Sequence, residues 1–344
     1  MRLNSSAQQD NQKVASETSR TMRALTYENY GSPQVVEITQ EPVPFPEEGQ
    51  VQVRVQASAV NTSDWRIRAA AFPGILAIPG RLMFGIFAPR NKMLGSEFAG
   101  IVETTGEGIS RFSVGDRVYG FTDKGGASAE FLTIGETSAI AAMPTSLGFA
   151  EAAALPFGAL CALSFLSDIA AIKPTQKLLV VGGSGGVGTY AVQIGKALGA
   201  HVTAVAGTEN QDYLLALGAD ETVDYKTTNV AAWPTGFDVV FDTVGGLRPA
   251  QALSLLAEDG KFFPLNFGLP ELGAALLNPF RRRKTVLAVN QDTAEGLERL
   301  NSLIERGLLR PVVENAFTLA QAVEAHQLVE TRHRRGSVVL TLQS

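Results

Sequence analysis

A run of glycines between two apolar segments is the clearest candidate for chemistry in this sequence of 344 residues. The run reads Gly183-x-Gly185-x-x-Gly188. In such a turn the first glycine permits a tight bend, the second lets the backbone approach a pyrophosphate, and the third allows a helix to pack closely on a strand. N–H groups at the start of that helix bind phosphate oxygens. The spacing therefore predicts a dinucleotide-binding loop made of Gly183, Ser184, Gly185, Gly186, Val187 and Gly188.

The segments on either side of the glycines are those that such a loop requires. Residues 178–181 (LLVV) form a short apolar run, which is typical of a buried parallel strand. The glycines lead into a predicted helix whose apolar residues recur at spacings of three and four, namely Val187, Ala191, Ile194 and Leu198. A second strand is predicted at 201–206. A glycine-rich turn without a ligand is the alternative, and the flanking strand and helix favour the dinucleotide interpretation.

The composition limits the kind of protein this can be. Hydrophobic residues make up 45% of the chain, and the formal net charge is -5, which indicates an ample core and argues against a nucleic-acid partner. The one cysteine, Cys161, lies in an apolar segment, so we expect a buried side chain, no disulfide and no multi-cysteine zinc site. Neither a signal peptide nor a membrane-spanning segment is evident, so a cytoplasmic location is expected.

The length and a change of pattern predict two domains. Residues 22–150 carry short strands and glycine-rich turns typical of a small β-barrel, after a polar tail, 1–21, that is expected to be disordered. Residues 151–312 begin with a helical link and then alternate strands with helices, the pattern of a doubly wound parallel sheet. The terminal strand near 335–340 is expected to return to the first domain, so that 313–344 complete it.

Three local predictions concern segments around the expected site. The stretch from Phe72 to Phe87 is predicted to be a long apolar loop, which serves either as a lid over the substrate or as an oligomer contact. Residues 285–289 are predicted to be a strand, and the basic run 281–284 before it a solvated turn rather than an anion or membrane site. Surface or helix-end positions are expected for the scattered histidines, His201, His326 and His333.

Several linked motifs resemble those of the medium-chain dehydrogenases/reductases, in their quinone oxidoreductase branch. The resemblance runs from about residue 22 to the end of the chain. It rests on the glycine-rich turn together with LGSEFAG (94–100), GDRV (115–118), ALP (154–156), LGAD (217–220) and DY (224–225). It implies an α/β fold in which a Rossmann doubly wound parallel sheet accompanies a GroES-like β-barrel catalytic domain. It also implies a nicotinamide cofactor and a small-molecule substrate, and we expect a homodimer.

The chain departs from the zinc alcohol dehydrogenases at the residues that would hold the metal. Those enzymes place a cysteine at the position of Asn61 and a histidine at that of Ser96, and they carry a four-cysteine structural zinc loop. We therefore expect no metal site. Hydride addition to an activated alkene or a quinone needs no Lewis acid, because the charge is delocalised onto a carbonyl oxygen that hydrogen bonds can stabilise.

Four polar residues are candidates for the catalytic site: Asn61, Ser63, Asp64 and Tyr119. The resemblance implies that the turn of Asn61 and Ser63 faces the nicotinamide, where either side chain could donate a hydrogen bond to a substrate carbonyl. Asp64 and Arg66 would then orient the turn. The alternative is that Asn61 and Asp64 only cap the short helix that follows. Tyr119 is a candidate proton donor or, alternatively, a tyrosine in the barrel core.

The cofactor is predicted to be NADP, with NADPH preferred over NADH. An NAD enzyme usually carries an acidic residue at the end of the second strand, whereas Gly207 stands 24 residues beyond the first glycine of the fingerprint here. Thr208 could bind a 2′-phosphate. The resemblance matches Tyr225 to a tyrosine that contacts this phosphate, and it places Asn266 near the nicotinamide. Glu209 argues instead for NADH, because it stands where close relatives often have a basic residue.

The sequence therefore predicts a zinc-independent, NAD(P)H-dependent oxidoreductase that reduces quinones or α,β-unsaturated carbonyls by hydride transfer. Two alternatives remain open. One is a zinc-independent alcohol or carbonyl dehydrogenase, and the other is a non-catalytic protein that senses NADPH by binding it. Turnover with an acceptor would separate the enzymes from the sensor.

Overall fold

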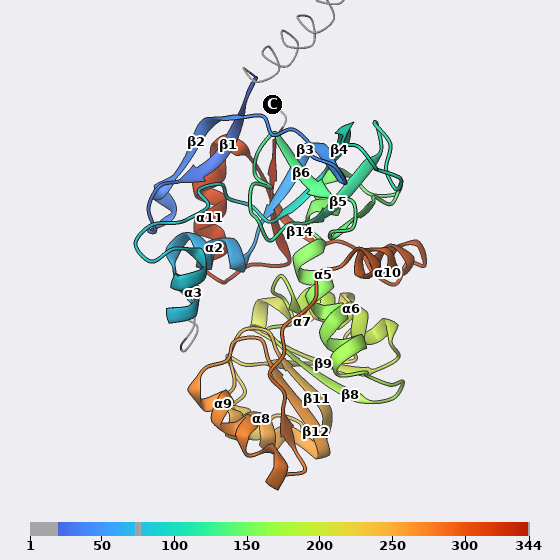
Figure 1. Ribbon diagram of the computed structural model, residues 1–344. Helices are drawn as coiled ribbons and strands as arrows, with labels where there is room; N and C mark the ends of the chain where they lie inside the picture. Colours follow the sequence, from blue (N-terminus) through green and yellow to red (C-terminus); the bar gives the residue numbers. More distant parts are fainter. Residues whose placement is uncertain (1–19, 73, 75–76, 343–344) are drawn as a thin grey trace, which may run out of the picture.

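Two sheets carry most of the strands, one in each half of the molecule (Figure 1). The computed structural model describes residues 20–72, 74 and 77–342. In the first half, β1 (Thr21–Tyr27) pairs with β2 (Val36–Pro42), and a seven-stranded sheet has the order β14-β15-β3-β4-β5-β7, with β6 paired to β3. Its strands are β3 (Gln50–Val60), β4 (Glu97–Thr105), β5 (Arg117–Phe121), β6 (Phe131–Gly135), β7 (Ile140–Ala142), β14 (Val313–Thr318) and β15 (Ser337–Thr341).

The second half is built on a six-stranded parallel sheet in the order β10-β9-β8-β11-β12-β13. Its strands are β8 (Lys177–Val181), β9 (His201–Ala206), β10 (Glu221–Asp224), β11 (Phe237–Asp242), β12 (Leu256–Pro264) and β13 (Lys284–Thr285). The chain begins in the middle with β8, moves outward through β9 and β10, and then crosses to the other side for β11. The strand order therefore reverses between β8 and β11, and ligands of open α/β sheets bind in the crevice at such a point.

The first strand of this sheet shows why its apolar run is continuous. Leu178 and Val180 belong to the core that includes side chains of α6 (Gly188–Ala197). Leu179 and Val181 belong to a separate core that includes side chains of α8 (Pro249–Leu255). Both faces of β8 are therefore covered, and the polar alternation of a half-exposed strand is absent. The first core also holds side chains of α7 (Gln211–Ala216) and α10 (Ala294–Glu305).

Two connections join the halves. α4 (Phe149–Ala153), α5 (Pro156–Leu163) and a π-helical segment, Ser164–Ile169, lead into β8, and their buried side chains belong to a core that reaches both sheets. Near the C-terminus, the chain returns from β13 through α10 to β14, and α11 (Ala322–Glu330) then leads to β15, which pairs parallel with β14 and antiparallel with β3. The predicted return of the terminal strand to the first domain is confirmed.

A helix interrupts the stretch from Phe72 to Phe87, which the sequence predicts to be a loop. After α2 (Thr62–Ala69), α3 (Ala77–Phe84) begins just before Pro79, whose missing N–H costs no hydrogen bond in the first turn of a helix. The rings of Phe72 and Phe84 stack with their centroids 5.4 Å apart. Residues 73, 75 and 76 lie outside the described residues, so a lid or an oligomer contact stays a prediction.

Two further predictions need correction, and one is confirmed. The strand predicted at 285–289 is wrong beyond Thr285, because only Lys284 and Thr285 pair with β12. His326 is fully buried within α11 rather than at the surface or a helix end, on a helix face shared with buried Ala325 and Val329. In the basic run 281–284, residues 281–283 are exposed and precede β13 as predicted, whereas Lys284 is already the first residue of that strand.

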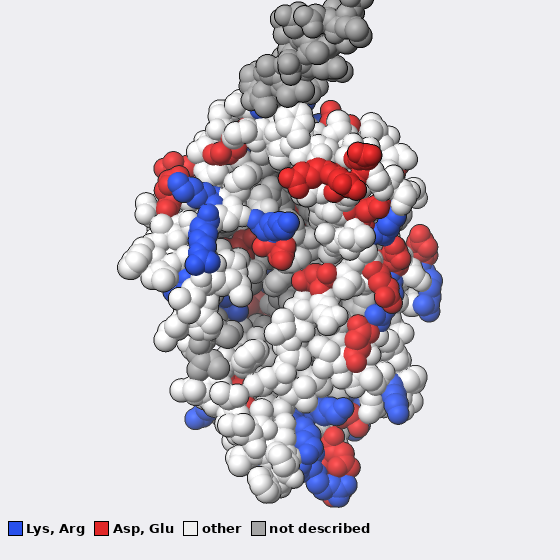
Figure 2. All heavy atoms as spheres, in the orientation of Figure 1, with Lys and Arg blue, Asp and Glu red and all other residues white. Residues whose placement is uncertain are grey.

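The predicted tail, 1–21, lies outside the described residues up to residue 19, and β1 already begins at Thr21. Within the part of the chain that the structure describes, no helix combines the length and the apolar composition needed to cross a bilayer. On the face shown in Figure 2, basic and acidic side chains are interspersed, and the surface is hollowed between the two halves.

Candidate functional site

The glycine-rich turn joins β8 to α6, and its contacts explain why glycines are needed. A Cβ atom on Gly188 would lie 2.0 Å from the carbonyl oxygen of Gly182, so only glycine lets α6 begin this close to the turn. Gly182 has a φ of 80°, in the left-handed region that favours glycine. A Cβ atom on Gly185 would meet nothing nearer than 3.5 Å, so this glycine leaves open space beside the turn.

The same turn presents free hydrogen-bond donors. The backbone N–H groups of Ser184, Gly186 and Val187 have no acceptor among the described residues. They lie just before α6, whose N-terminus carries the positive end of the helix dipole. Unpaired N–H groups at such a position attract a phosphate or another anion. The turn therefore has the donors and the space that a pyrophosphate requires.

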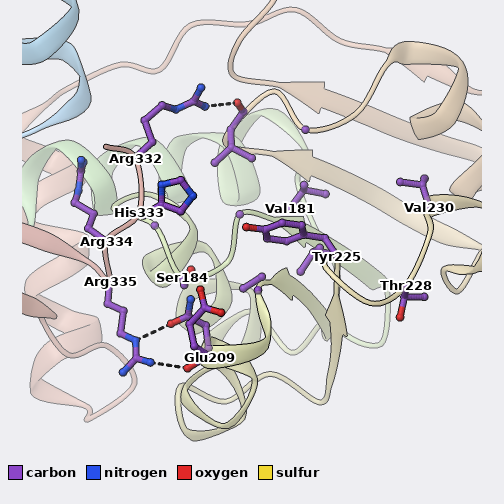
Figure 3. Close-up of a pocket in the computed structure, with 18 of the residues that line it drawn as sticks. Val181, Ser184, Glu209, Tyr225, Thr228, Val230, Arg332, His333, Arg334 and Arg335 are labelled. Atoms are coloured by element: carbon purple, nitrogen blue, oxygen red, sulfur yellow. Dashed lines mark hydrogen bonds between the residues drawn. The ribbon is translucent and has the colours of Figure 1, made fainter. Parts of the chain in front are cut away.

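A cavity of about 840 Å³ lies beside this turn (Figure 3). It is bounded by residues that follow four parallel strands, which include Gly182, Ser184 and Gly185 after β8, Gly207 after β9, Tyr225 after β10, and Val244 and Gly246 after β11. This is the crevice at the point where the strand order reverses. Its volume falls within the range of small-molecule sites, about 300–1,000 Å³. The cavity therefore fits a dinucleotide in both place and size.

The end of the cavity beside β9 carries residues that could distinguish NADPH from NADH. A Cβ atom on Gly207 would lie 3.0 Å from the carboxylate of Glu209, which pairs with Lys226 at 2.8 Å. Tyr225 is half exposed and lines the cavity. Thr208 does not line it, because its hydroxyl donates to Asp224 instead. The structure thus brings Tyr225 to this end and turns Thr208 away.

Sequence reasoning missed a basic segment, 332–335, that forms one wall of the cavity. In Figure 3 the ring of Tyr225 points toward this segment. The N–H of Gly336 donates to the carbonyl of Ser184 at 3.0 Å and so holds the segment against the glycine-rich turn. The run Arg332-His333-Arg334-Arg335 is visible in the sequence. Its place beside the turn follows from the return of β15, which no local pattern reveals.

Two arginines of this segment bind backbone groups around the cavity. Arg332 donates to the carbonyl oxygen of Val244 at 2.6 Å, after β11. Arg335 donates to the carbonyl oxygen of Glu209 at 2.5 Å and to the side chain of Asn210 at 2.6 Å, after β9. The segment therefore fixes two cationic side chains on opposite sides of the glycine-rich turn.

The predicted catalytic turn is closely hydrogen-bonded. The Asn61 side-chain oxygen accepts from the N–H groups of Ser63 at 2.8 Å and Asp64 at 3.1 Å, and the Asp64 carboxylate accepts from the N–H of Asn61 at 2.9 Å. Asn61 and Asp64 thus cap α2, which is the alternative that the sequence left open. The Asn61 amide nitrogen donates to Ser96 and to Glu97, each at 2.9 Å. Both amide hydrogens of Asn61 are therefore used within the protein.

Two carboxyl groups are buried in this network. Glu97 also accepts from the N–H of Phe157 at 2.8 Å, at the start of α5, and so links the catalytic turn to the helix that leads into the second half. Burial raises the pKa of Asp64 to about 7 and that of Glu97 to about 8, although their hydrogen bonds and the charge of Arg334 act in the opposite direction. Sequence reasoning missed Glu97, since its partners are distant in the chain.

The remaining candidates lie in different places. Tyr119 is fully buried, with its hydroxyl 2.8 Å from the Asn301 side-chain oxygen, so it occupies the barrel-core position rather than the cavity wall. Ser63 is half-buried, and its hydroxyl has no partner in the described part of the chain. Asn266 follows β12 and accepts a hydrogen bond from the guanidinium of Arg66 at 2.6 Å. Arg66 thus reaches from α2 across to the second half.

The positions that would hold zinc carry an amide and a hydroxyl. The nitrogen of Asn61 and the oxygen of Ser96 lie 2.9 Å apart and bind each other, and neither is a usual zinc ligand. Over residues 20–72, 74 and 77–342, no three His, Cys, Asp or Glu side chains are grouped as metal ligands. Cys161 is buried in α5, as predicted, and burial raises the pKa of its thiol.

Comparison with known families finds two matches along the chain. Residues 47–165 match the family described as "Alcohol dehydrogenase GroES-like domain". Residues 217–340 match the family described as "Zinc-binding dehydrogenase". The two matched regions cover parts of the β-rich half and of the half that contains the parallel sheet.

Proteins similar along nearly the whole chain include two plant reductases. A chloroplast envelope quinone oxidoreductase homolog from Arabidopsis thaliana is 32% identical over 337 residues, which cover 93% of this chain and 98% of the relative. A 2-methylene-furan-3-one reductase from Solanum lycopersicum is 31% identical over 348 residues, which cover 96% and 83%.

Solved structures show the same arrangement. The quinone oxidoreductase from Coxiella burnetii has a TM-score of 0.84 and 29% identity, with 94% of this chain and 100% of that chain covered. A mycobacterial protein solved in complex with NADPH has a TM-score of 0.79 and 27% identity, with 93% and 100% covered.

Proposed function

Because this chain belongs to the medium-chain dehydrogenase/reductase superfamily, in its quinone oxidoreductase-like branch, we propose that it reduces quinones or α,β-unsaturated carbonyls with a nicotinamide cofactor. We further propose that it does so without a catalytic zinc. Two relatives at 31% and 32% identity, named as a 2-methylene-furan-3-one reductase and a quinone oxidoreductase homolog, support this substrate class.

Two features carry the proposal, and a hydrogen bond links them, because Arg334 of the cavity wall donates to the hydroxyl of Thr62 in the catalytic turn at 3.2 Å. The glycine-rich turn offers free N–H groups at the crevice of the parallel sheet. The catalytic turn that the family resemblance places opposite it has Asn61 and Ser96 bound to each other where metal ligands would stand. A site of this composition suits acceptors whose developing charge is already delocalised, because hydrogen bonds suffice to stabilise it.

The residues of the cavity fit a nicotinamide dinucleotide. The N–H groups of Ser184, Gly186 and Val187 would hold its pyrophosphate, with the open space at Gly185 allowing close approach. When bound, this cofactor supplies the hydride. A dinucleotide lies across the reversal of strand order, so its adenosine half would lie toward β9 and β10. Its nicotinamide half would then lie toward β11 and β12.

NADPH rather than NADH is the proposed cofactor. Position 207 carries no carboxylate, and the carboxylate of Glu209 is already paired with Lys226. Besides Lys226, this end of the cavity, beside β9, has a second cation, Arg335. Tyr225 contributes a phenol hydroxyl there. Two cations and a phenol are suited to a 2′-phosphate, whereas a free carboxylate would favour a 2′-hydroxyl. We do not include Thr208 in the proposed phosphate site, because its hydroxyl donates a hydrogen bond to Asp224.

A panel of acceptors tests the proposal. NADPH oxidation should be followed with benzoquinone, an aliphatic enone, a saturated ketone and no acceptor, alongside NADPH binding. We expect multiple turnovers with the first two only. Faster turnover with the saturated ketone would favour a carbonyl dehydrogenase, and NADPH binding without turnover would favour a sensor. A homodimeric state and a cytoplasmic location stay predictions from the sequence.

A further inference from the structure

The guanidinium of Arg66 connects the catalytic turn with the second half of the molecule. It lies on the first helix after that turn, α2, and donates to the side-chain oxygen of Asn266 at 2.6 Å. Its other N–H groups have no acceptor in the described part of the chain. Burial, and then the charge of Arg332, lower the pKa of Arg66. Arg66 is therefore a half-buried cation with free donors, held next to a second cation.

Several contacts place this guanidinium beside one end of the cavity, although neither Arg66 nor Asn266 lines it. Asn266 packs against Gly245, since a Cβ atom on that glycine would lie 3.3 Å from the Cβ of Asn266. The neighbours Val244 and Gly246 line the cavity, and Arg332 donates to the carbonyl of Val244. Val244, Gly245 and Gly246 follow β11, and Asn266 follows β12. Arg66 thus reaches the side of the crevice where the nicotinamide half would lie, if the proposed function is right.

The other polar groups of the catalytic turn leave few donors for a substrate. Both amide hydrogens of Asn61 are bound by Ser96 and Glu97. Both oxygens of the buried Asp64 carboxyl accept hydrogen bonds within the protein, one from the N–H of Asn61 and the other from the hydroxyl of Ser96. Donors without a partner on this side include the hydroxyl of Ser63, the buried indole N–H of Trp65 and the free N–H groups of Arg66. Of these, only the guanidinium carries a charge and bonds to a residue that follows β12.

We propose that Arg66, rather than Asn61, binds the substrate carbonyl oxygen and stabilises the negative charge that forms on it. This inference rests on the proposed function. Hydride addition brings one hydrogen and two electrons to the substrate and forms one new bond, while the dinucleotide is oxidised by the same two electrons. The carbonyl oxygen is left with one negative charge. One proton from water then completes the hydroquinone or the saturated ketone.

The chemistry of the guanidinium suits this role. It stays charged at any working pH, so it stabilises an oxyanion without itself transferring a proton. Its planar donors are held by Asn266 on one edge, which leaves the others for a carbonyl or for the two oxygens of a conjugated acceptor. Donors fixed before the reaction favour the charged transition state over the neutral substrate. The site should therefore select acceptors that place charge on oxygen.

Two substitutions of Arg66 and one matched control test the proposal. Arg66→Met keeps the length of the side chain and removes the charge, and Arg66→Lys restores a charge. Arg54→Met, which removes an arginine paired with Glu103 elsewhere on the β-rich half, controls for the loss of any arginine. We expect Arg66→Met to lower kcat with benzoquinone by on the order of 10²-fold. Arg66→Lys should recover part of that loss, and Arg54→Met should behave as wild type.

Two readouts besides turnover separate charge stabilisation from structure. NADPH binding, followed by fluorescence, should change by less than about twofold in Arg66→Met. The second probe is 4-nitrophenol, whose phenolate is coloured and resembles a hydroquinone anion. Its pKa when bound with NADP⁺ should fall below the free value in wild type and not in Arg66→Met. If Arg66→Met does not fold, Asn266→Asp supplies a second test, because its carboxylate would neutralise the guanidinium and lower kcat.

Each contrary result has a distinct meaning. Wild-type kcat in Arg66→Met, or an unchanged pKa of bound 4-nitrophenol in wild type, would overturn the assignment of Arg66. Equal losses of kcat and of NADPH affinity would show that Arg66 holds the cofactor instead. A large loss in Ser63→Ala with none in Arg66→Met would assign the role to Ser63. An absence of any turnover by the wild type would refute the proposed function itself.

Discussion

Two glycines of the glycine-rich turn, Gly185 and Gly188, should affect different properties when each is replaced by alanine, the first cofactor binding and the second stability. A Cβ atom at position 185 would lie 3.5 Å from the Gly182 oxygen, which is an ordinary contact. A Cβ atom at position 188 would lie 2.0 Å from the same oxygen and 2.8 Å from the Gly182 carbonyl carbon, both of them backbone atoms. Gly185→Ala should therefore fold normally and bind the dinucleotide poorly. Gly188→Ala should lose stability.

The expected sizes follow from these contacts. Moving backbone to relieve the contact at position 188 should cost about 1–3 kcal/mol of the free energy of unfolding. At position 185 the change in that free energy should stay within about 1 kcal/mol, because a methyl group fits. The same methyl group would separate the pyrophosphate from the turn. Losing one charge-assisted hydrogen bond costs about 1.5–3 kcal/mol, which is roughly a tenfold to hundredfold weaker affinity.

Urea denaturation and a fluorescence titration with NADPH measure both quantities on the same samples. The two variants serve as controls for each other, since they add the same group to neighbouring positions of one turn. Wild-type affinity in a folded Gly185→Ala variant would mean that the pyrophosphate does not approach this turn. Wild-type stability in Gly188→Ala would mean that α6 does not begin against Gly182.

Three further outcomes are expected. Arg335→Ser should weaken NADPH binding about tenfold more than NADH binding, and equal losses measured by titration would contradict a phosphate contact. The pKa values of Asp64 (about 7) and Glu97 (about 8) lie above their unfolded values of 3.8 and 4.5. Their contribution to stability is therefore complete below those unfolded values and lost as the pH rises through 7 to 8. Between pH 5 and pH 9 the free energy of unfolding in urea should fall by roughly 1–3 kcal/mol more in wild type than in Asp64→Asn, and parallel pH curves would contradict this. Buried Cys161 should resist iodoacetamide in the native protein, as read by mass spectrometry, and rapid alkylation would mean that the thiol is accessible.

The features that the sequence predicts well are those determined by residues close together in the chain. The spacing of Gly183, Gly185 and Gly188 encodes a tight turn with close helix packing, and the structure has that turn. The uninterrupted apolar run of β8 follows from its burial on both faces. Such signals lie within a few residues of the feature they predict.

The features that the sequence does not predict depend on partners far along the chain. Arg335 reaches the cavity only because β15 returns to pair with β3. The amide of Asn61 is occupied by Glu97, whose position follows from the pairing of β3 with β4. His326 is buried because α11 packs against other elements of the first half. Spacing along the sequence carries no information about these contacts.

We propose above that this site reduces quinones or enones with NADPH and needs no zinc. The most direct measurement is multiple-turnover oxidation of NADPH with benzoquinone by protein dialysed against a strong chelator, with zinc determined on the same sample. We expect undiminished turnover with less than stoichiometric zinc. Activity that disappears on chelation and returns with added zinc would contradict it.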